Sequence, residues 1–517
     1  MFSHKHSGAL VVFALLLFAA VPALAATWTV TSLADDGSAG TLRYVLAETA
    51  PGDTVTFSVT GTITLTQGAL TVNGVTITGP GARQLAISGG YFPAILQETP
   101  LTNVLLTNGT VSISGVTVED GYNGDLPASA YHGGAAITNF GPALTISNSV
   151  ITGNYDAINH GIIMNICTVL TITDSTISNN TSGSTAITNI TCPSNVANPA
   201  PLTVTNSTFS GNSSGAIGGG DAAVVIVTGD TFTGNGVPAS TGGLFPNGVL
   251  SFGGMLGTFA VTNSTFSGNS GIAITNFTGN VTVANSTFSG NTGGAIYTDP
   301  VLTEQTSSTT VKNSLLANGA SGGNCLGTTT TSSTPANSTL ISGGHNLTDD
   351  TTCTAFTQLG DVNNPSGGVG LSPSGLQNNG GPTETIALLA TSPAVNAIPA
   401  APTNYCTDAS GNPLTTDQRG VTRPQGTGCD IGAYELVMIS GMIKLVNSYH
   451  LPVIAQDILT DTLTFAEKAP TTTSSCLDLS AFIIEVDLAR DVRDLTAAQA
   501  SQLITDTNEV KTSKGCR

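Results

Sequence analysis

A ten-residue phrase recurs along the middle of this chain and constrains its fold more than any other feature. It reads TVTNSTFSGN at 203–212, AVTNSTFSGN at 260–269 and TVANSTFSGN at 282–291. The asparagines that close this phrase and its weaker copies lie 22 to 34 residues apart, at Asn154, Asn180, Asn212, Asn235, Asn269 and Asn291. A unit of this length cannot bury its own apolar face and must stack on the next unit, so the sequence predicts a solenoid.

Each unit contains three short stretches of β-strand character. In the clearest unit they are Leu202–Thr205, Ser207–Ser210 and Ala216–Ile217. Apolar residues alternate with Ser and Thr, which places Val204, Phe209 and Ile217 on the inner face. Three strands per turn predict a right-handed parallel β-helix, because parallel crossover connections are almost always right-handed.

The repeated asparagines have two physical uses in such a fold. Asparagine tolerates the left-handed backbone conformation of sharp turns. Asparagines stacked in successive rungs can also join their amide groups into a ladder of hydrogen bonds. We therefore interpret the N-x-[S/T] sequences at Asn206, Asn263 and Asn285 as turn chemistry, with glycosylation as the alternative.

The composition excludes several classes of protein. Only 9% of the residues are charged, against about 25% in ordinary proteins. Hydrophobic residues still make up 40%, which excludes general disorder. The net charge of -19 argues against a nucleic acid or an anionic membrane as partner.

The first 26 residues have the pattern of an export signal. Lys5 supplies the positive start, residues 9–20 are apolar, and Ala23-Leu24-Ala25 matches a cleavage site. A retained membrane anchor is the alternative, but this apolar run is short for a membrane span. We expect an exported protein, located outside the cell or on its surface, with no transmembrane segment in the mature chain.

Eight cysteines in an exported chain predict disulfides. Sequence order suggests the pairs Cys167–Cys192, Cys325–Cys353, Cys406–Cys429 and Cys476–Cys516. The first pair is separated by about one coil, which would place its cysteines in adjacent rungs about 4.8 Å apart. A metal site is the competing interpretation, but the chain has no C-x-x-C sequence.

The front of the chain predicts a cap for the rod. Residues 38–50 are the one helix-like stretch there, with Asp35, Asp36 or Ser38 as the expected capping residue. An amphipathic helix at this place would cover the apolar end of the first rung. Strand-like sequence resumes at residue 54 and continues to about 345, which corresponds to about 12 rungs.

Three parts of the chain resemble known bacterial proteins. The Phe-x-x-Asn and Gly-Gly-Ala-Ile sequences, as at 209–212 and 293–296, are similar to the repeats of polymorphic outer membrane proteins. LQNNGGPTETIALLATSPAVN at 376–396 and TDQRGVTRPQGTGCDIGAYE at 416–435 resemble the choice-of-anchor Q region of surface proteins. The chain departs from these relatives after residue 436, where it has too few residues for an autotransporter barrel and no recognisable sorting tail.

The last 81 residues, 437–517, have helical periodicity and resemble small helical modules of the FIMAH-like type. Leu479, Phe482, Ile483 and Val486 form an i, i+3, i+4, i+7 stripe, and Thr496 is placed to cap a second helix. We read the stripe as a core face, with a partner groove as the alternative.

The sequence therefore predicts an all-β right-handed parallel β-helix with an N-terminal helical cap and a small α-helical C-terminal domain. The expected divisions are a signal peptide at 1–26, a cap at 27–53, the β-helix at 54–350, a choice-of-anchor Q-like region at 351–436 and the helical module at 437–517.

Many right-handed β-helices are polysaccharide lyases or glycosidases, and the residues bear on both activities. Lyases of this fold use a Lys or Arg base, yet no Lys or Arg occurs between Arg83 and Lys312. Glycosidases need paired carboxylates across a cleft. The candidates for such a site are weak and consist of Asp120, Asp125, His132, Asp156 and His160. His160 also aligns with Asn139, Asn189 and Asn276, so it is alternatively a substitute for a ladder asparagine.

A dense group of charges occurs late in this charge-poor chain. It consists of Asp417, Arg419, Arg423, Asp430 and Glu435. We interpret it as an ion-paired structural cluster stapled by Cys406–Cys429, with a functional site as the alternative.

These observations favour a non-catalytic surface or extracellular protein. We expect it to contact surface glycans or other cell-surface proteins through the insertions at 121–132, 190–201 and 236–258, because loops vary while rungs cannot. The alternatives are a polysaccharide-degrading enzyme, more a glycosidase than a lyase, and a spacer that presents the helical module. No cofactor is expected; calcium is conceivable, but no sequence feature supports it. The sequence sets no oligomeric state.

Overall fold

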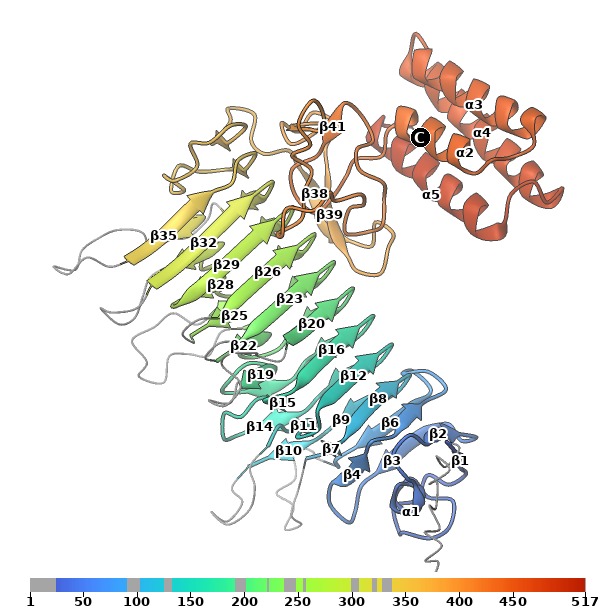
Figure 1. Ribbon diagram of the computed structural model, residues 1–517. Coiled ribbons are helices and arrows are strands. Elements are labelled where there is room, and N and C mark those ends of the chain that lie inside the picture. The colour runs from blue at the N-terminus through green and yellow to red at the C-terminus, as the bar shows by residue number, and fades with distance from the viewer. Residues whose placement is uncertain are drawn as a thin grey trace, which may run out of the picture.

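The protein is a β-helical rod with a helical module near its C-terminal end, as the computed structural model in Figure 1 shows. It describes residues 25–90, 103–124, 133–190, 201–220, 223–236, 248–253, 257–298, 306–318, 323–327 and 337–516. The predicted signal peptide lies almost entirely outside these residues.

Three parallel sheets form the sides of the rod, and successive rungs contribute one strand to each. The first sheet contains β1 (Thr27–Val30), β2 (Thr54–Phe57), β5 (Thr76–Thr78), β8 (Thr110–Ser114), β12 (Ala143–Ser147), β16 (Val169–Thr173), β20 (Pro201–Thr205), β23 (Val224–Thr228), β26 (Thr258–Thr262), β29 (Gly279–Ala284), β32 (Thr306–Lys312) and β35 (Asn337–Ser342). The second sheet contains β3 (Gly61–Thr64), β6 (Leu85–Ser88), β9 (Thr117–Glu119), β13 (Val150–Thr152), β17 (Thr176–Ser178), β21 (Thr208–Ser210), β24 (Thr231–Thr233), β27 (Thr265–Ser267), β30 (Thr287–Ser289), β33 (Leu315–Ala317), β36 (Leu347–Thr348) and β37 (Val362–Asn363). The third sheet contains β4 (Leu70–Asn73), β7 (Leu105–Asn108), β11 (Ile137–Asn139), β15 (Ile163–Ile166), β19 (Ile187–Ile190), β22 (Ile217–Gly219), β25 (Gly248–Phe252), β28 (Ile272–Asn276), β31 (Ile296–Thr298) and β34 (Cys325–Leu326). A short fourth sheet contains β10 (Tyr122–Asn123), β14 (Tyr155–Asp156) and β18 (Thr181–Ser182).

The parallel β-helix predicted from the repeat is confirmed. The rod begins earlier than expected, because β1 lies within the stretch 27–53 that was predicted as cap and pairs with β2. It also ends later, because β37 adds a last strand at Val362–Asn363.

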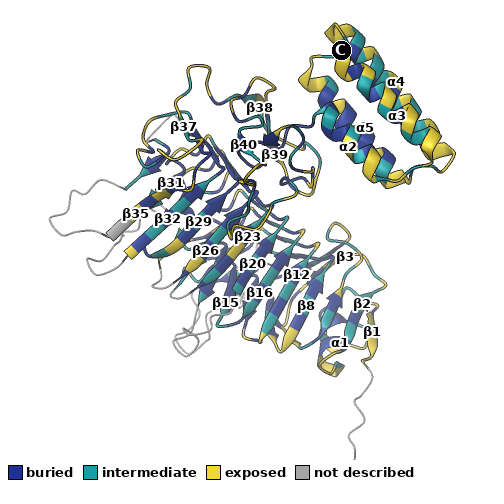
Figure 2. Ribbon diagram, turned by 45° about the horizontal axis from the view of Figure 1, so that its top comes forward, coloured by how far each residue is buried: buried dark blue, intermediate teal, exposed yellow. Residues whose placement is uncertain are grey.

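The core of the rod is a stack of identical side chains in register. Val204, Phe209 and Ile217 are fully buried, as the alternation predicted. Phe209 begins a column in which successive ring centroids lie 5.1, 4.6 and 4.7 Å apart, formed with Phe232, Phe266 and Phe288. Buried residues consequently form continuous stripes across neighbouring strands in Figure 2.

The asparagines that close the repeated phrase lie in one buried column at the end of the second sheet. Each side-chain amide donates to the Oδ1 of the next asparagine at 2.7–3.1 Å. The column consists of Asn154, Asn180, Asn212, Asn235, Asn269, Asn291, Asn318 and Asn324. This geometry is the ladder that the repeat suggested.

A second column, of serines, was not predicted and follows the corner between the first and second sheets. The corner asparagine has a left-handed backbone, as at Asn206 with a φ of 53°, and serine follows it. The serine hydroxyl accepts the N–H of the preceding rung, for example from Ser149 to Ser175 at 3.2 Å and from Ser264 to Ser286 at 3.3 Å. The Asn-Ser pair therefore makes a turn and a ladder at once.

Helix α1 (Leu42–Glu48) covers the first rung with Leu42, Val45 and Leu46, which join the core of the rod. The predicted capping residue was wrong, because Thr41 is the N-cap and its hydroxyl accepts from the Tyr44 N–H. Asp35 instead binds the Arg43 guanidinium at 2.7 Å.

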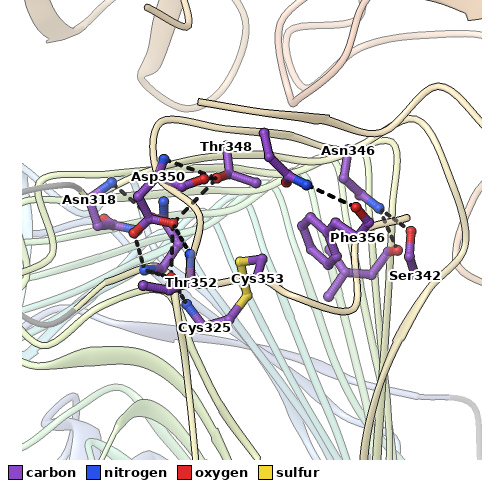
Figure 3. Close-up of a disulfide and its surroundings, with 12 residues drawn as sticks. Asn318, Cys325, Ser342, Asn346, Thr348, Asp350, Thr352, Cys353 and Phe356 are labelled. Atoms are coloured by element: carbon purple, nitrogen blue, oxygen red, sulfur yellow. Dashed lines mark hydrogen bonds between the residues drawn. A yellow bond between two sulfur atoms is a disulfide. The ribbon is translucent and has the colours of Figure 1, made fainter. Parts of the chain in front are cut away.

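The other end of the rod is closed by the disulfide Cys325–Cys353, drawn in Figure 3. Next to it the Asp350 carboxylate accepts from the Asn324 and Thr352 N–H groups at 2.9 and 3.0 Å. Phe356 is buried in the core of the rod beyond this disulfide. The last coil is thus held by a covalent bond and an aromatic plug.

The chain then turns back along the rod. Residues 383–436, the return segment, follow the hairpin strand β38 (Leu371–Gln377), and they include β39 (Thr385–Leu388) and the short pair β40 (Ile398–Pro399) and β41 (Gly428–Cys429). The predicted disulfide Cys406–Cys429 lies within this segment.

The return segment covers the asparagine corner of the later rungs. The side chains of Asn263, Asn285 and Asn313 donate to the carbonyls of Thr416, Thr407 and Tyr405 at 2.9, 2.7 and 2.9 Å. Two of the three sequons, at Asn263 and Asn285, are therefore buried under another part of the chain.

Four helices form the C-terminal module: α2 (Ile439–Ser448), α3 (Val453–Lys468), α4 (Thr472–Asp491) and α5 (Ala497–Ser513). Leu479, Phe482 and Val486 are buried between the helices, and Thr496 caps α5 as expected. The disulfide Cys476–Cys516 ties α4 to the end of the described chain. Of the helices in the described ranges, none is long and apolar enough to cross a membrane.

Candidate functional site

The predicted acidic cluster of the rod is only partly within the described residues. Asp120, Asp156 and His160 are described, whereas Asp125 and His132 lie outside. The buried Asp156 carboxylate accepts from Ser182 Oγ at 2.8 Å, from the Gly161 N–H at 2.7 Å and from Asn123 Nδ2 at 3.2 Å. Both of its oxygens thus hold the turn after β14 in place.

Asp120 lies at a corner of the rod with a left-handed φ of 52°. Its Oδ2 accepts from Ser88 Oγ at 3.0 Å. Burial raises the pKa of Asp120, and burial together with the Asp120 charge raises the pKa of the adjacent Glu119. Two neighbouring carboxyls with raised pKa values are thus present, a feature that the sequence analysis did not single out.

His160 does not replace a ladder asparagine. The strand register places Asn165 opposite Asn139 and Asn189, and His160 lies in the connection between β14 and β15. These three asparagines form their own column, with Nδ2 to Oδ1 distances of 2.8 and 2.7 Å. The interpretation of His160 as a ladder residue was wrong because turn length shifts its position relative to the strand.

No group of three or more His, Cys, Asp or Glu side chains placed to hold a metal ion occurs among the residues whose positions are described. The three predicted disulfides at Cys325, Cys406 and Cys476 are present. Cys167 is also disulfide-bonded, and its predicted partner Cys192 lies outside the described residues.

The connections of the rod differ sharply between its corners. From β8 to β33, two residues separate each strand of the first sheet from the next strand of the second, as between Ser114 and Thr117. Connections that enter or leave the third sheet vary instead, from four residues between β27 and β28 to fourteen between β24 and β25. The predicted insertions at 121–132, 190–201 and 236–258 all belong to this variable group.

The late charges form a buried ion-paired cluster, as interpreted from the sequence. Arg423 binds Glu435 at 3.0 Å, and both side chains are fully buried. Asp430 accepts from the N–H groups of Asn396 and Leu436 at 2.6 and 2.7 Å. Burial and the nearby Glu435 charge raise the pKa of Asp430 to about 7. These contacts fix the fold of the return segment.

The same cluster joins the helical module to the return segment. Arg419 binds Asp417 at 2.8 Å and Glu509 of α5 at 2.7 Å, and its guanidinium lies 3.6 Å from the centre of the Tyr434 ring. Glu509 also accepts from the Tyr434 hydroxyl at 2.5 Å. No pattern in the sequence pointed to Glu509, because its partners lie 75 and 90 residues away.

A groove of about 500 Å³ lies beside this junction, between the β38–β39 hairpin and α5. Its lining includes Ser372, Gln377, Asn379, Thr505, Asn508 and Tyr434. Amide and hydroxyl groups of this kind donate and accept hydrogen bonds without carrying charge. The one carboxylate in the lining, Glu509, is already paired with Arg419.

Comparison with known proteins bears on the fold. Residues 194–355 match the family model described as right handed beta helix region. The catalytic unit of a thermostable GH87 alpha-1,3-glucanase from Streptomyces thermodiastaticus strain HF3-3 is similar at 14% identity and a TM-score of 0.32, over 59% of this chain and 64% of that one. The catalytic domain of a GH87 alpha-1,3-glucanase in complex with tetrasaccharides is similar at 12% identity and a TM-score of 0.30, over 62% of this chain and 69% of that one.

No curated protein matches the chain. The two solved structures are too distant to bear on activity. The right-handed parallel β-helix of this chain rests on its own strand pairing and on the family match.

Proposed function

We propose that this protein is an exported, non-catalytic surface or extracellular protein that contacts glycans or other surface proteins through loops inserted in its β-helix. The resemblances to polymorphic outer membrane proteins, to choice-of-anchor Q regions and to FIMAH-like modules support this proposal. It includes a signal peptide at 1–26 that is removed on export. The three disulfides suit an oxidising extracellular environment.

The observation that carries the proposal is the uneven distribution of connection lengths. The two-residue corner between the first and second sheets is uniform, and the return segment covers it in the later rungs. Variable connections gather around the third sheet alone. A rod that keeps one corner constant and varies the opposite connections has the arrangement of a scaffold that displays binding loops.

Glycans are the favoured ligand class for a chemical reason. Sugars offer many neutral hydroxyl groups, which pair with uncharged donors and acceptors. This chain is poor in charge and rich in Asn, Ser and Thr, and the groove between the β38–β39 hairpin and α5 has such a lining. That groove offers a second surface of the same chemistry.

The competing function is a polysaccharide-degrading enzyme that uses acidic residues of the rod. The hydrogen bonds of Asp156 weigh against it, because a general acid or base must be free to exchange a proton with substrate. Asp120 and Glu119 are the remaining carboxyls with the raised pKa that acid catalysis uses.

The test uses the full mature chain with neutral and acidic polysaccharides, measured for binding and for release of reducing ends. We expect binding without turnover, and weaker binding when residues 237–247 are replaced by a short Gly-Ser linker. The matched control replaces residues 409–411, the exposed tip of the return segment, and leaves binding unchanged. Turnover that Asp120→Asn or Asp156→Asn abolishes would establish the enzyme instead.

A further inference from the structure

The outer side of the helical module carries a large apolar surface. We define the outer face as the exposed side chains of Ile454, Ile458, Phe465, Leu477, Ile484, Leu488 and Val492, which are between 48% and 76% exposed. All of them belong to α3, α4 or the residue that follows α4. Soluble proteins rarely leave so many large apolar side chains together in water without a partner.

These residues form two parallel stripes. On α3, Ile454, Ile458 and Phe465 are spaced i, i+4 and i+11, and on α4, Leu477, Ile484 and Leu488 are spaced i, i+7 and i+11. Residues with these spacings share one face of a helix. The stripes extend over eleven residues, or about 16 Å. Helices α3 and α4 pack directly against each other, so the stripes run side by side.

A groove of about 390 Å³ lies between the stripes at one end. It is lined by Ile454, Ile458, Leu488 and Val492, with Glu485 as a carboxylate in the lining. Glu485 Oε1 accepts from Thr462 at 3.0 Å, whereas Oε2 is buried and receives no hydrogen bond from the described part of the chain. Burial raises the pKa of Glu485. The groove thus holds one acceptor that lacks a donor.

The surroundings of the outer face are acidic. Helices α3 and α4 carry seven Asp and Glu residues and two Lys and Arg residues. Arg490, one of the two basic residues, is already paired with Asp487 and Asp491. An occupant of this surface therefore needs apolar groups for the stripes and positive charge for the groove and its rim.

This charge distribution disfavours two other occupants. A second copy would bring its own acidic face and a chain with a net charge of -19. A lipid surface of the anionic type would be repelled in the same way. The module's inner contacts also leave this side free, because Glu509 of α5 and Ser440 of α2 bind the return segment.

We propose that the outer face of α3 and α4 is the docking surface for a basic amphipathic helix of a partner protein. Its apolar residues, at i, i+4, i+7 and i+11, lie in the trough between the two stripes. A Lys or Arg of the partner donates to Glu485 Oε2.

The test uses the full mature chain and a set of synthetic amphipathic helices of about 18 residues with Leu on one face. In one group the polar face carries Lys, with the Leu register offset between peptides, and in the matched group Glu replaces each Lys. Binding is measured by calorimetry, and hydrogen exchange shows which residues become protected. Neutral and anionic vesicles and sedimentation of the chain alone cover the other occupants.

We expect a Lys peptide to bind and to protect α3 and α4. Leu488→Ser should weaken this binding about tenfold and Glu485→Gln several-fold, since buried apolar and ion-paired contacts dominate such interfaces. Leu359→Ser, an equally exposed position at the end of the rod, should leave binding unchanged. Circular dichroism checks that each variant keeps its helices.

Four outcomes overturn the proposal. They are equal binding of Lys and Glu peptides, binding that Leu488→Ser does not weaken, vesicle binding in place of peptide binding, and dimers of the chain alone that Leu488→Ser disrupts. Failure of every Lys peptide to bind also refutes it, whatever the result of the glycan experiments.

Discussion

Two asparagines of one repeat unit should respond in opposite ways to loss of the side chain. Asn212 is buried in the ladder, where its amide donates to Ile177 O and Asn235 Oδ1, each at 2.9 Å. Its Oδ1 accepts from the Nδ2 and N–H of Asn180 at 3.0 and 3.3 Å. Asn206, six residues earlier, instead adopts a left-handed corner conformation that glycine reaches without strain.

The magnitude follows from the count of these bonds. Asn212→Ala removes four hydrogen bonds of a buried side chain, and each contributes about 1 kcal/mol. We expect the rung to lose about 4 kcal/mol of local stability. Asn206→Gly keeps the corner geometry and should change stability by less than about 1 kcal/mol.

The assay is native-state hydrogen exchange of the full chain with its disulfides intact, because a solenoid does not unfold in a single two-state step. The N–H of Asn180 loses its acceptor in Asn212→Ala, so its exchange should accelerate by about a thousandfold, at 1.4 kcal/mol per factor of ten. Equal exchange at Asn180 in both variants would show that the ladder contributes nothing. A larger effect from Asn206→Gly would show that the corner side chain, and not its backbone geometry, stabilises the turn.

Three further predictions concern the return segment and the helical module. Arg423→Met leaves Glu435 buried without its partner and should lower the free energy of unfolding by about 3–5 kcal/mol, whereas Arg490→Met, at an exposed pair, should have no measurable effect in the same denaturation experiment. Burial raises the pKa of Asp506 to about 7, so the folded chain binds this proton more tightly than the unfolded chain, and stability should fall as the pH rises from about 4 to about 7. Asp506→Asn should remove this loss, worth at most about 4 kcal/mol, and thermal unfolding at pH 8 should show the variant more stable than the parent. Replacing both cysteines of Cys406–Cys429 by Ser opens a loop of 23 residues and should cost about 3 kcal/mol, and a return segment that stays fully protected from exchange would contradict this.

The repeat was sufficient to predict the architecture because its signal is local. Alternation over three to five residues identified the inward positions, so Val204, Phe209 and Ile217 were placed correctly by their pattern alone. A fixed distance between equivalent asparagines identified the ladder in the same way. The serine column was visible too, since Ser follows the corner Asn in each phrase, but alternation gave it a strand role instead.

The predictions failed where turn length or a distant segment decided the outcome. His160 was aligned with the asparagines of the third sheet, yet the longer turn after β14 gives that register position to Asn165. Asp35 was expected to cap α1, but it binds Arg43 and the N–H groups of Thr66 and Gln67, which come from a later rung.

Stacking of rungs is already specified by the amino-acid sequence, because the strands, corners and ladders of a solenoid arise between residues about one coil apart. Long-range packing was needed to establish that residues 383–436 turn back over the asparagine corner and that Glu509 joins the helical module to Arg419. These contacts join residues 72 to 188 positions apart, where no periodicity links them. The same packing leaves α3 and α4 of the helical module uncovered, because a hydrophobic stripe in a sequence does not specify which of its neighbours will bury it.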